Sequence, residues 1–122
     1  MEKQIHLMQH ILELSETMDE GMTHIHSQLK AGKQDETVYL FEDFVQAFAS
    51  IENAIETVDD EFKNDEVDEK TKDVKKNIEA VVQLYEMKDY DKIVENMESG
   101  LFPNLNEWRS QLETAFQPHT MN

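Results

Sequence analysis

Two histidines and a glutamate near the N-terminus have the spacing of metal ligands on one helix. His6 and His10 are four residues apart, and Glu13 follows three residues later. On an α-helix these side chains share one face, and imidazole and carboxylate groups bind transition metals. A metal centre in a helical bundle also needs ligands from facing helices, and the Glu-x-x-His motif of di-iron bundles does not occur. We therefore expect no metal or other cofactor.

The sequence contains no recognisable motif for a catalytic nucleophile. The chain contains no cysteine, and its serines lie in helical patterns without the glycine-rich turn that exposes a nucleophile. The three glycines are isolated from one another, so a phosphate-binding loop is not possible. The sequence therefore predicts a protein that is not an enzyme.

The charge balance limits the class of partner. There are 27 acidic residues against 11 basic ones, which gives a formal net charge of −16. Nucleic acids and anionic membranes both attract lysine and arginine, so we expect neither as a direct partner. The chain also lacks a run of 18 apolar residues and the apolar core of a signal peptide. A cytoplasmic location is the expectation.

Apolar residues recur at three- and four-residue steps in four segments, which is the period of amphipathic helices. The segments span residues 3–31, 35–62, 67–87 and 90–116. Helices joined by short connections pack as an antiparallel, up-down-up-down bundle. The sequence thus predicts an all-α fold with residues 1–122 in one domain. A three-helix bundle with a loose arm is the alternative.

Gly100 and Pro103 interrupt the fourth segment. Proline removes a backbone hydrogen bond and clashes with the preceding turn, so we expect the fourth helix to be kinked or broken between these two residues. The apolar stripe keeps its phase across the interruption, which favours a kink. Residues 117–122 are expected to form a disordered tail.

The sequence contains more apolar side chains than a single four-helix core is expected to bury. Tyr39 lies off the aromatic stripe of the second segment, and Phe102 precedes Pro103. An exposed patch of this kind would mark a partner-binding surface or a homodimer interface. We therefore predict that a partner-binding groove involves Tyr39, Phe102 and Trp108.

The stretch YEMKDYDKIVENMESGLFPNLNEWRSQLETAF, residues 85–116, carries a resemblance. It is similar to the C-terminal part of small, acidic, helical-bundle proteins of Bacillus-type bacteria, and it covers about a quarter of the chain. Those families have no established activity, so the resemblance implies a helical fold and no function. In size, acidity and helicity the chain also resembles flagellar export chaperones, although their motifs are not evident.

Three functions follow from these patterns, in descending order. The first is a non-enzymatic adaptor that binds one helix of an unknown protein partner, in the manner of an export chaperone. The second is an acidic mimic of nucleic acid that inhibits a basic protein. The third is a metal-binding bundle that uses His6, His10 and Glu13.

Overall fold

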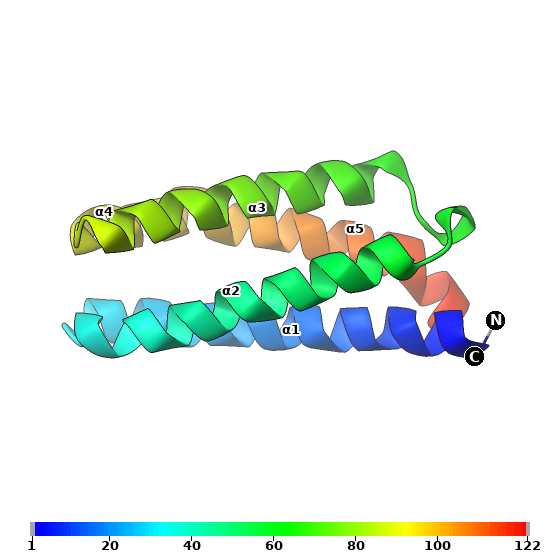
Figure 1. Cartoon of the computed structure of the whole chain (residues 1–122), viewed down its shortest axis with the longest axis horizontal. Helices are drawn as coiled ribbons and strands as arrows, with labels where there is room; N and C mark the ends of the chain where they lie inside the picture. Colours follow the sequence, from blue (N-terminus) through cyan, green and yellow to red (C-terminus); the bar gives the residue numbers. More distant parts are fainter. Residues whose placement is uncertain (1, 122) are drawn as a thin grey trace.

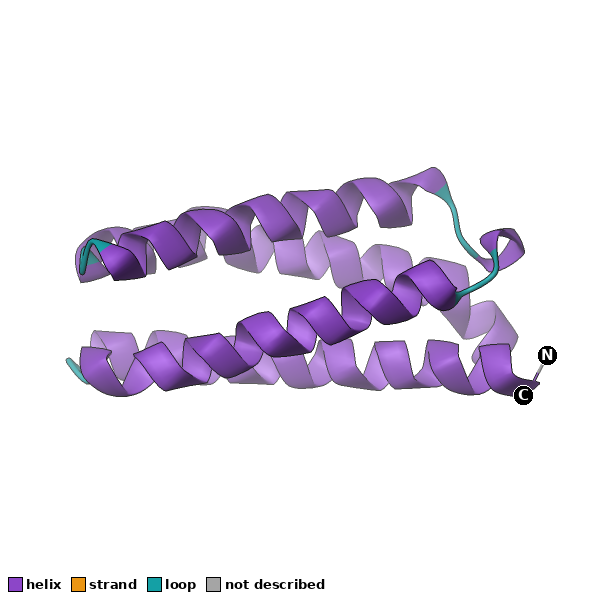
Figure 2. Cartoon of the chain, viewed as in Figure 1, coloured by secondary structure: helices purple, strands orange, loops and turns teal. Residues whose placement is uncertain are grey.

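The computed structural model describes residues 2–121, and within them every long element is a helix (Figure 2). The elements are α1 (Glu2–Lys30), α2 (Gln34–Thr57), α3 (Asp65–Glu86), α4 (Tyr90–Asn96) and α5 (Phe102–Thr120). A 3₁₀ turn spans Asp60–Phe62, and a π turn spans Met97–Leu101. The predicted all-α, up-down-up-down bundle is confirmed (Figure 1).

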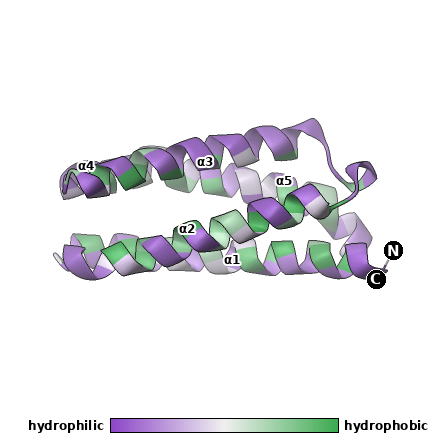
Figure 3. Cartoon of the chain, in the orientation of Figure 1, coloured by the Kyte–Doolittle hydropathy of each residue, from purple (hydrophilic) through white to green (hydrophobic). Residues whose placement is uncertain are grey.

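One apolar core runs the length of the bundle. Each helix directs a stripe with helical spacing inward, while hydrophilic residues occupy its other faces (Figure 3). The largest completely buried side chains are Trp108, Phe116, Met8, Ile11, Met22, Ile25, Ile51, Ile93, Met97, Leu101, Leu105 and Leu112. Helix α1 packs against both α2 and α5, and α5 packs against α3. No described helix is long and apolar enough to cross a bilayer.

Helix α1 ends at Lys30, two residues before a glycine. Gly32 has a φ of +81°, a conformation that residues with a Cβ rarely adopt. The amide of Gly32 donates to the carbonyl of Leu29, and the amide of Lys33 donates to that of Gln28 at 3.0 Å. These two bonds form a Schellman cap, so α2 begins directly afterwards at Gln34.

Helix α2 is shorter than the sequence predicts. Its last helical residue is Thr57, and Val58 is already extended with a ψ of 137°. Val58 and Phe62 are nevertheless buried, because the connection folds back over the end of the core. The Lys63 ammonium donates to the carbonyl of Ile55 at 3.0 Å and so closes the helix end. The apolar residues keep helical spacing through residues 58–62, although this segment is not α-helical. This spacing explains why the predicted helix ends too late.

The fourth segment is one kinked helix with a π turn at its centre. The amide of Phe102 donates to the carbonyl of Met97, five residues earlier, so the turn is wider than in an α-helix. Pro103 has no amide hydrogen and its ring needs room near the preceding turn. The wider turn provides that room, and α4 and α5 follow one another without a break.

The predicted tail is shorter than expected. Helix α5 continues to Thr120, so residues 117–120 are helical rather than disordered. Phe116 is completely buried, which holds this last turn against the bundle. The ring of His119 lies edge-on to that of Phe62, with 4.7 Å between centroids. Asn122 of the predicted tail lies outside the described residues.

The two helical glycines provide a matched test of this packing. A Cβ at Gly21 would meet nothing within 4 Å, whereas a Cβ at Gly100 would lie 2.9 Å from Nδ2 of Asn77. Asn77 is held in place because Asn104 donates a hydrogen bond to its Oδ1.

We predict that Gly21→Ala stabilises the protein by about 1 kcal/mol through helix propensity. Gly100→Ala should lose this gain and destabilise by about 1 kcal/mol, because an overpacked contact strains its neighbours. Urea unfolding followed by circular dichroism measures both changes. Equal stabilisation by the two substitutions would contradict the close contact at Gly100.

Candidate functional site

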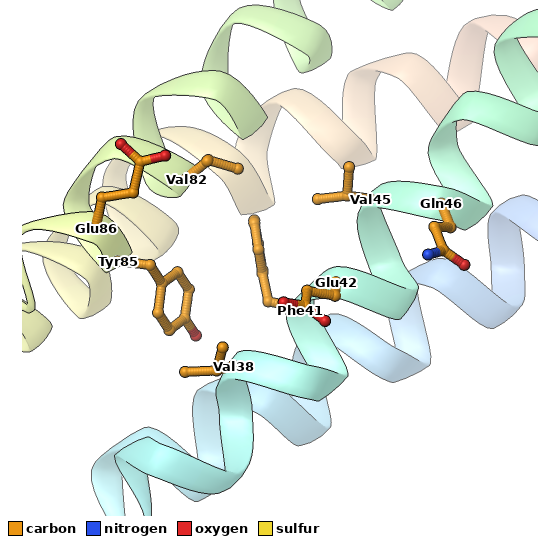
Figure 4. A pocket seen from close by; sticks show the side chains of 8 residues that line it. All are labelled: Val38, Phe41, Glu42, Val45, Gln46, Val82, Tyr85 and Glu86. Atoms are coloured by element: carbon orange, nitrogen blue, oxygen red, sulfur yellow. The ribbon is translucent and has the colours of Figure 1, made fainter.

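A groove of about 530 Å³ lies between α2 and α3. Its lining is mainly apolar and consists of Val38, Phe41, Glu42, Val45, Gln46, Val82, Tyr85 and Glu86. Figure 4 shows Val82 and Tyr85 of α3 on one side of the groove and the α2 residues on the other. The three valines are half-buried, so their outer surfaces remain open to a ligand.

The groove exists because α2 and α3 do not pack closely along their length. The two helices approach one another near their connection at residues 58–64 and diverge toward the opposite end of the bundle (Figure 1). Helix α2 is held mainly by α1, and α3 mainly by α5, so each wall has its own support. The groove therefore lies between two helices that are each packed on a different neighbour.

Tyr85 links the two walls at the open end. Its hydroxyl donates to Oγ1 of Thr37 at 3.0 Å, and that buried threonine donates to the carbonyl of Gln34 at 2.7 Å. The ring of Tyr85 lies 5.2 Å from that of Phe41, which forms the floor of the groove. Burial raises the pKa of Tyr85 above its usual value of 10.0, although the hydrogen bond with Thr37 acts in the opposite direction.

The groove combines an apolar floor with polar side chains at its rim. Its polar side chains are the carboxylates Glu42 and Glu86, the amide Gln46 and the hydroxyl of Tyr85. Glu42, Glu86 and Gln46 are exposed at the rim, while the apolar side chains form the floor. Such an arrangement suits an apolar ligand whose edges are polar.

The three residues predicted to bind a partner do not form one surface. Tyr39 is 72% exposed on α2, and Phe102 is half-buried, with its ring edge-on to that of His26. Trp108 is completely buried. The structure therefore corrects the prediction for Trp108, because a side chain in the core cannot contact a partner at the surface.

Trp108 instead holds α5 to α3. Its indole Nε1 donates to Oγ1 of Thr71 at 3.0 Å, and Thr71 donates to the carbonyl of Val67 at 2.6 Å. The ring also lies 5.5 Å from that of Phe48. Apolar packing and a satisfied hydrogen bond together explain why tryptophan occupies this position.

The candidate metal ligands lie on the outer face of α1. His6, His10 and Glu13 are all exposed, which is the ordinary position of polar side chains on an amphipathic helix. Within residues 2–121, no three His, Asp or Glu side chains gather in a way that could hold a metal ion.

The apolar spacing of the second and third segments includes Val38, Val45, Val82 and Tyr85, so the sequence alone predicts a place in the core for these residues. The signal for a groove was the spacing of Val38, Phe41 and Val45, which repeats the three-four pattern beside the main stripe. A second apolar stripe on one helix indicates a second surface to be covered.

The structure is that of an all-α bundle with an apolar groove between α2 and α3. This chain belongs to the family described as "Domain of unknown function (DUF8042)", whose model matches residues 6–111. The matched range contains both walls of the groove. No curated protein and no solved structure gives a match.

The positions of Tyr39 and Trp108 predict opposite effects of truncation. Trp108→Ala should destabilise the protein by about 3–5 kcal/mol, because it leaves a large cavity in the core. Tyr39→Ala should change stability by no more than about 0.5 kcal/mol, as is usual at exposed positions. Thermal and urea unfolding of both variants measure this difference, and a mild effect of Trp108→Ala would contradict its burial.

Tyr85→Phe should cost about 1 kcal/mol at neutral pH, because it removes the hydrogen bond between the groove walls. The raised pKa means that the neutral phenol stabilises the native state, fully below pH 10 and less as pH rises through the native pKa. The advantage of the natural protein over Tyr85→Phe should therefore shrink above pH 10. Urea unfolding between pH 7 and pH 11 tests this, and a difference independent of pH would refute it.

Proposed function

We propose that this protein is a non-enzymatic interaction protein that binds a helix of a partner protein in the α2–α3 groove. The observation that carries the proposal is the apolar floor of the groove, formed by Phe41 and flanked by Val45 and Val82. An apolar surface that faces water is costly unless something covers it. A partner segment would cover it and gain binding energy in doing so.

A helix is the segment that fits these walls. The apolar side chains of α2 recur at Val38, Phe41 and Val45, and those of α3 at Val82 and Tyr85. These are the ridges that a third helix packs against when it lies between two others. Amphipathic helices bind such grooves through apolar residues at three- and four-residue steps. The export-chaperone-like role and the cytoplasmic location stay predictions.

Site-specific crosslinking tests where the partner binds. A benzophenone amino acid at Gln46, exposed at the groove, should crosslink the partner in lysate of the native host. The same group at Asn106, exposed on α5, should not. Mass spectrometry should then place the crosslink in an amphipathic helix of one protein. A crosslink at Asn106 alone would overturn the proposed site.

Matched valine variants test whether the groove supplies the affinity. Val82→Gln places a polar group in the groove, and Val94→Gln makes the same change at a half-buried position of α4 outside it. We expect Val82→Gln to weaken binding of the identified partner at least tenfold, and Val94→Gln to leave it nearly unchanged. Equal losses would show that only general stability matters. Binding that depends on salt and not on Val82 would favour the acidic mimic instead.

A further inference from the structure

Helix α2, which forms one wall of the groove, is strongly acidic, and its Glu42 lines the groove. It carries six acidic side chains and no lysine, arginine or histidine. The acidic residues are Asp35, Glu36, Glu42, Asp43, Glu52 and Glu56. Among the ion pairs within residues 2–121, only Glu52 of this set has a basic partner, Lys75 of α3 at 3.5 Å. The charge of this wall is therefore largely uncompensated.

The part of α3 that lines the groove is acidic as well. The lysines of α3 all precede residue 77, and Lys70 and Lys75 pair with Glu107 and Glu52. From residue 77 to the end of α3, the charged side chains are Glu79 and Glu86. Both walls therefore present carboxylates and no cation beside the apolar floor.

We propose that the occupant of the groove is a basic amphipathic helix, with lysine or arginine flanking its apolar face. This inference rests on the proposed function and specifies the chemistry of the partner. The apolar residues of the occupant would cover Phe41, Val45 and Val82, while its basic residues would meet Glu42 on one rim and Glu86 on the other. Opposite charges at a rim favour the correct partner and speed its association.

Charge also distinguishes this occupant from a second copy of the chain. Two copies joined at this groove would bring Glu42 and Glu86 of one copy close to those of the other, and no basic residue lines the groove. Like charges placed opposite one another cost free energy, and each copy has a net charge of −16. A basic helix would instead be attracted by the same negative charges.

Tyr39 gives the basic helix a second contact on the α2 rim. It precedes Glu42 by three residues and Gln46 by seven, so the three side chains share one face of α2. The ring is 72% exposed, and an aromatic face attracts lysine and arginine cations. This accounts for a large aromatic side chain in solvent beside two rim residues of the groove.

Three synthetic helices of one length test the inference. The peptides have about 18 residues, or five turns, and share the same leucine positions at three- and four-residue steps. Their flanking positions carry lysine, glutamine or glutamate, and fluorescence anisotropy measures the Kd of each at low and high salt. We expect the lysine peptide to bind at least tenfold more tightly than the glutamine peptide at low salt. The glutamate peptide should bind more weakly than both.

Two double variants with the same change in net charge locate the effect. Glu42→Gln with Glu86→Gln should weaken the lysine peptide about threefold to tenfold and leave the glutamine peptide unchanged. Glu16→Gln with Glu20→Gln, on the exposed face of α1, should have little effect on either. Equal losses from both double variants would overturn the inference, because the attraction would then belong to the whole molecule.

The peptides also separate this inference from the proposed function. If lysine and glutamine peptides bind equally, and Val82→Gln weakens both, the groove binds helices and the basic partner is wrong. If no peptide binds, both fail. Sedimentation of the protein alone gives the remaining result, since a dimer disrupted by Val82→Gln would overturn both in favour of a second copy.

Discussion

The spacing of apolar residues in the last helix is the constraint on which the core depends. Ile93, Met97, Leu101 and Leu105 follow at three successive steps of four residues, whereas the other helices alternate three and four. In an α-helix each step of four overshoots a full turn by about 40°, so three such steps would carry the stripe away from the core. The π turn Met97–Leu101 holds more residues per turn and removes much of this drift. All four residues are completely buried as a result.

The groove is a consequence of how this core is filled. With the stripe of α5 in phase, Trp108 contacts Phe48 of α2 and donates to Thr71 of α3, so its large side chain lies between the helices. Helix α2 is anchored through α1 and helix α3 through α5, so α2 and α3 make little direct contact with each other. Phe41 is then buried from within, while its neighbours Val45 and Val82 stay half-open. The packing that completes the core therefore leaves the apolar groove open at the surface.

The helices could be predicted from apolar spacing and from single residues such as glycine and proline. The end of α2, the burial of Trp108 and the groove depend on packing between helices. Gly32 marked the end of α1 because a positive φ is a property of one residue, and the phase across Pro103 indicated a kink rather than a break. The end of α2 was wrong because Val58 and Phe62 keep helical spacing while the backbone is extended or 3₁₀. Trp108 was placed at a surface because a single helix does not reveal which of its apolar residues face the centre. Predicting the groove requires the relative positions of α2 and α3, and the apolar pattern of one helix does not contain that information.

Helix α2 carries six carboxylates, of which Glu52 alone has a basic partner within the described residues. Glu52 and Glu56 are four residues apart on one helix face, and like charges at that spacing destabilise a helix by a few tenths of a kcal/mol. Within the described residues, Lys75 is the single basic partner of α2, and it pairs with Glu52, so this repulsion is partly relieved. The carboxylates that line the groove are Glu42 and Glu86. A basic helix in the groove would meet these two carboxylates and cover the apolar floor at the same time. Ligands that bind only the native state stabilise it. An occupant that covers the apolar floor and meets the rim carboxylates would therefore stabilise the native bundle.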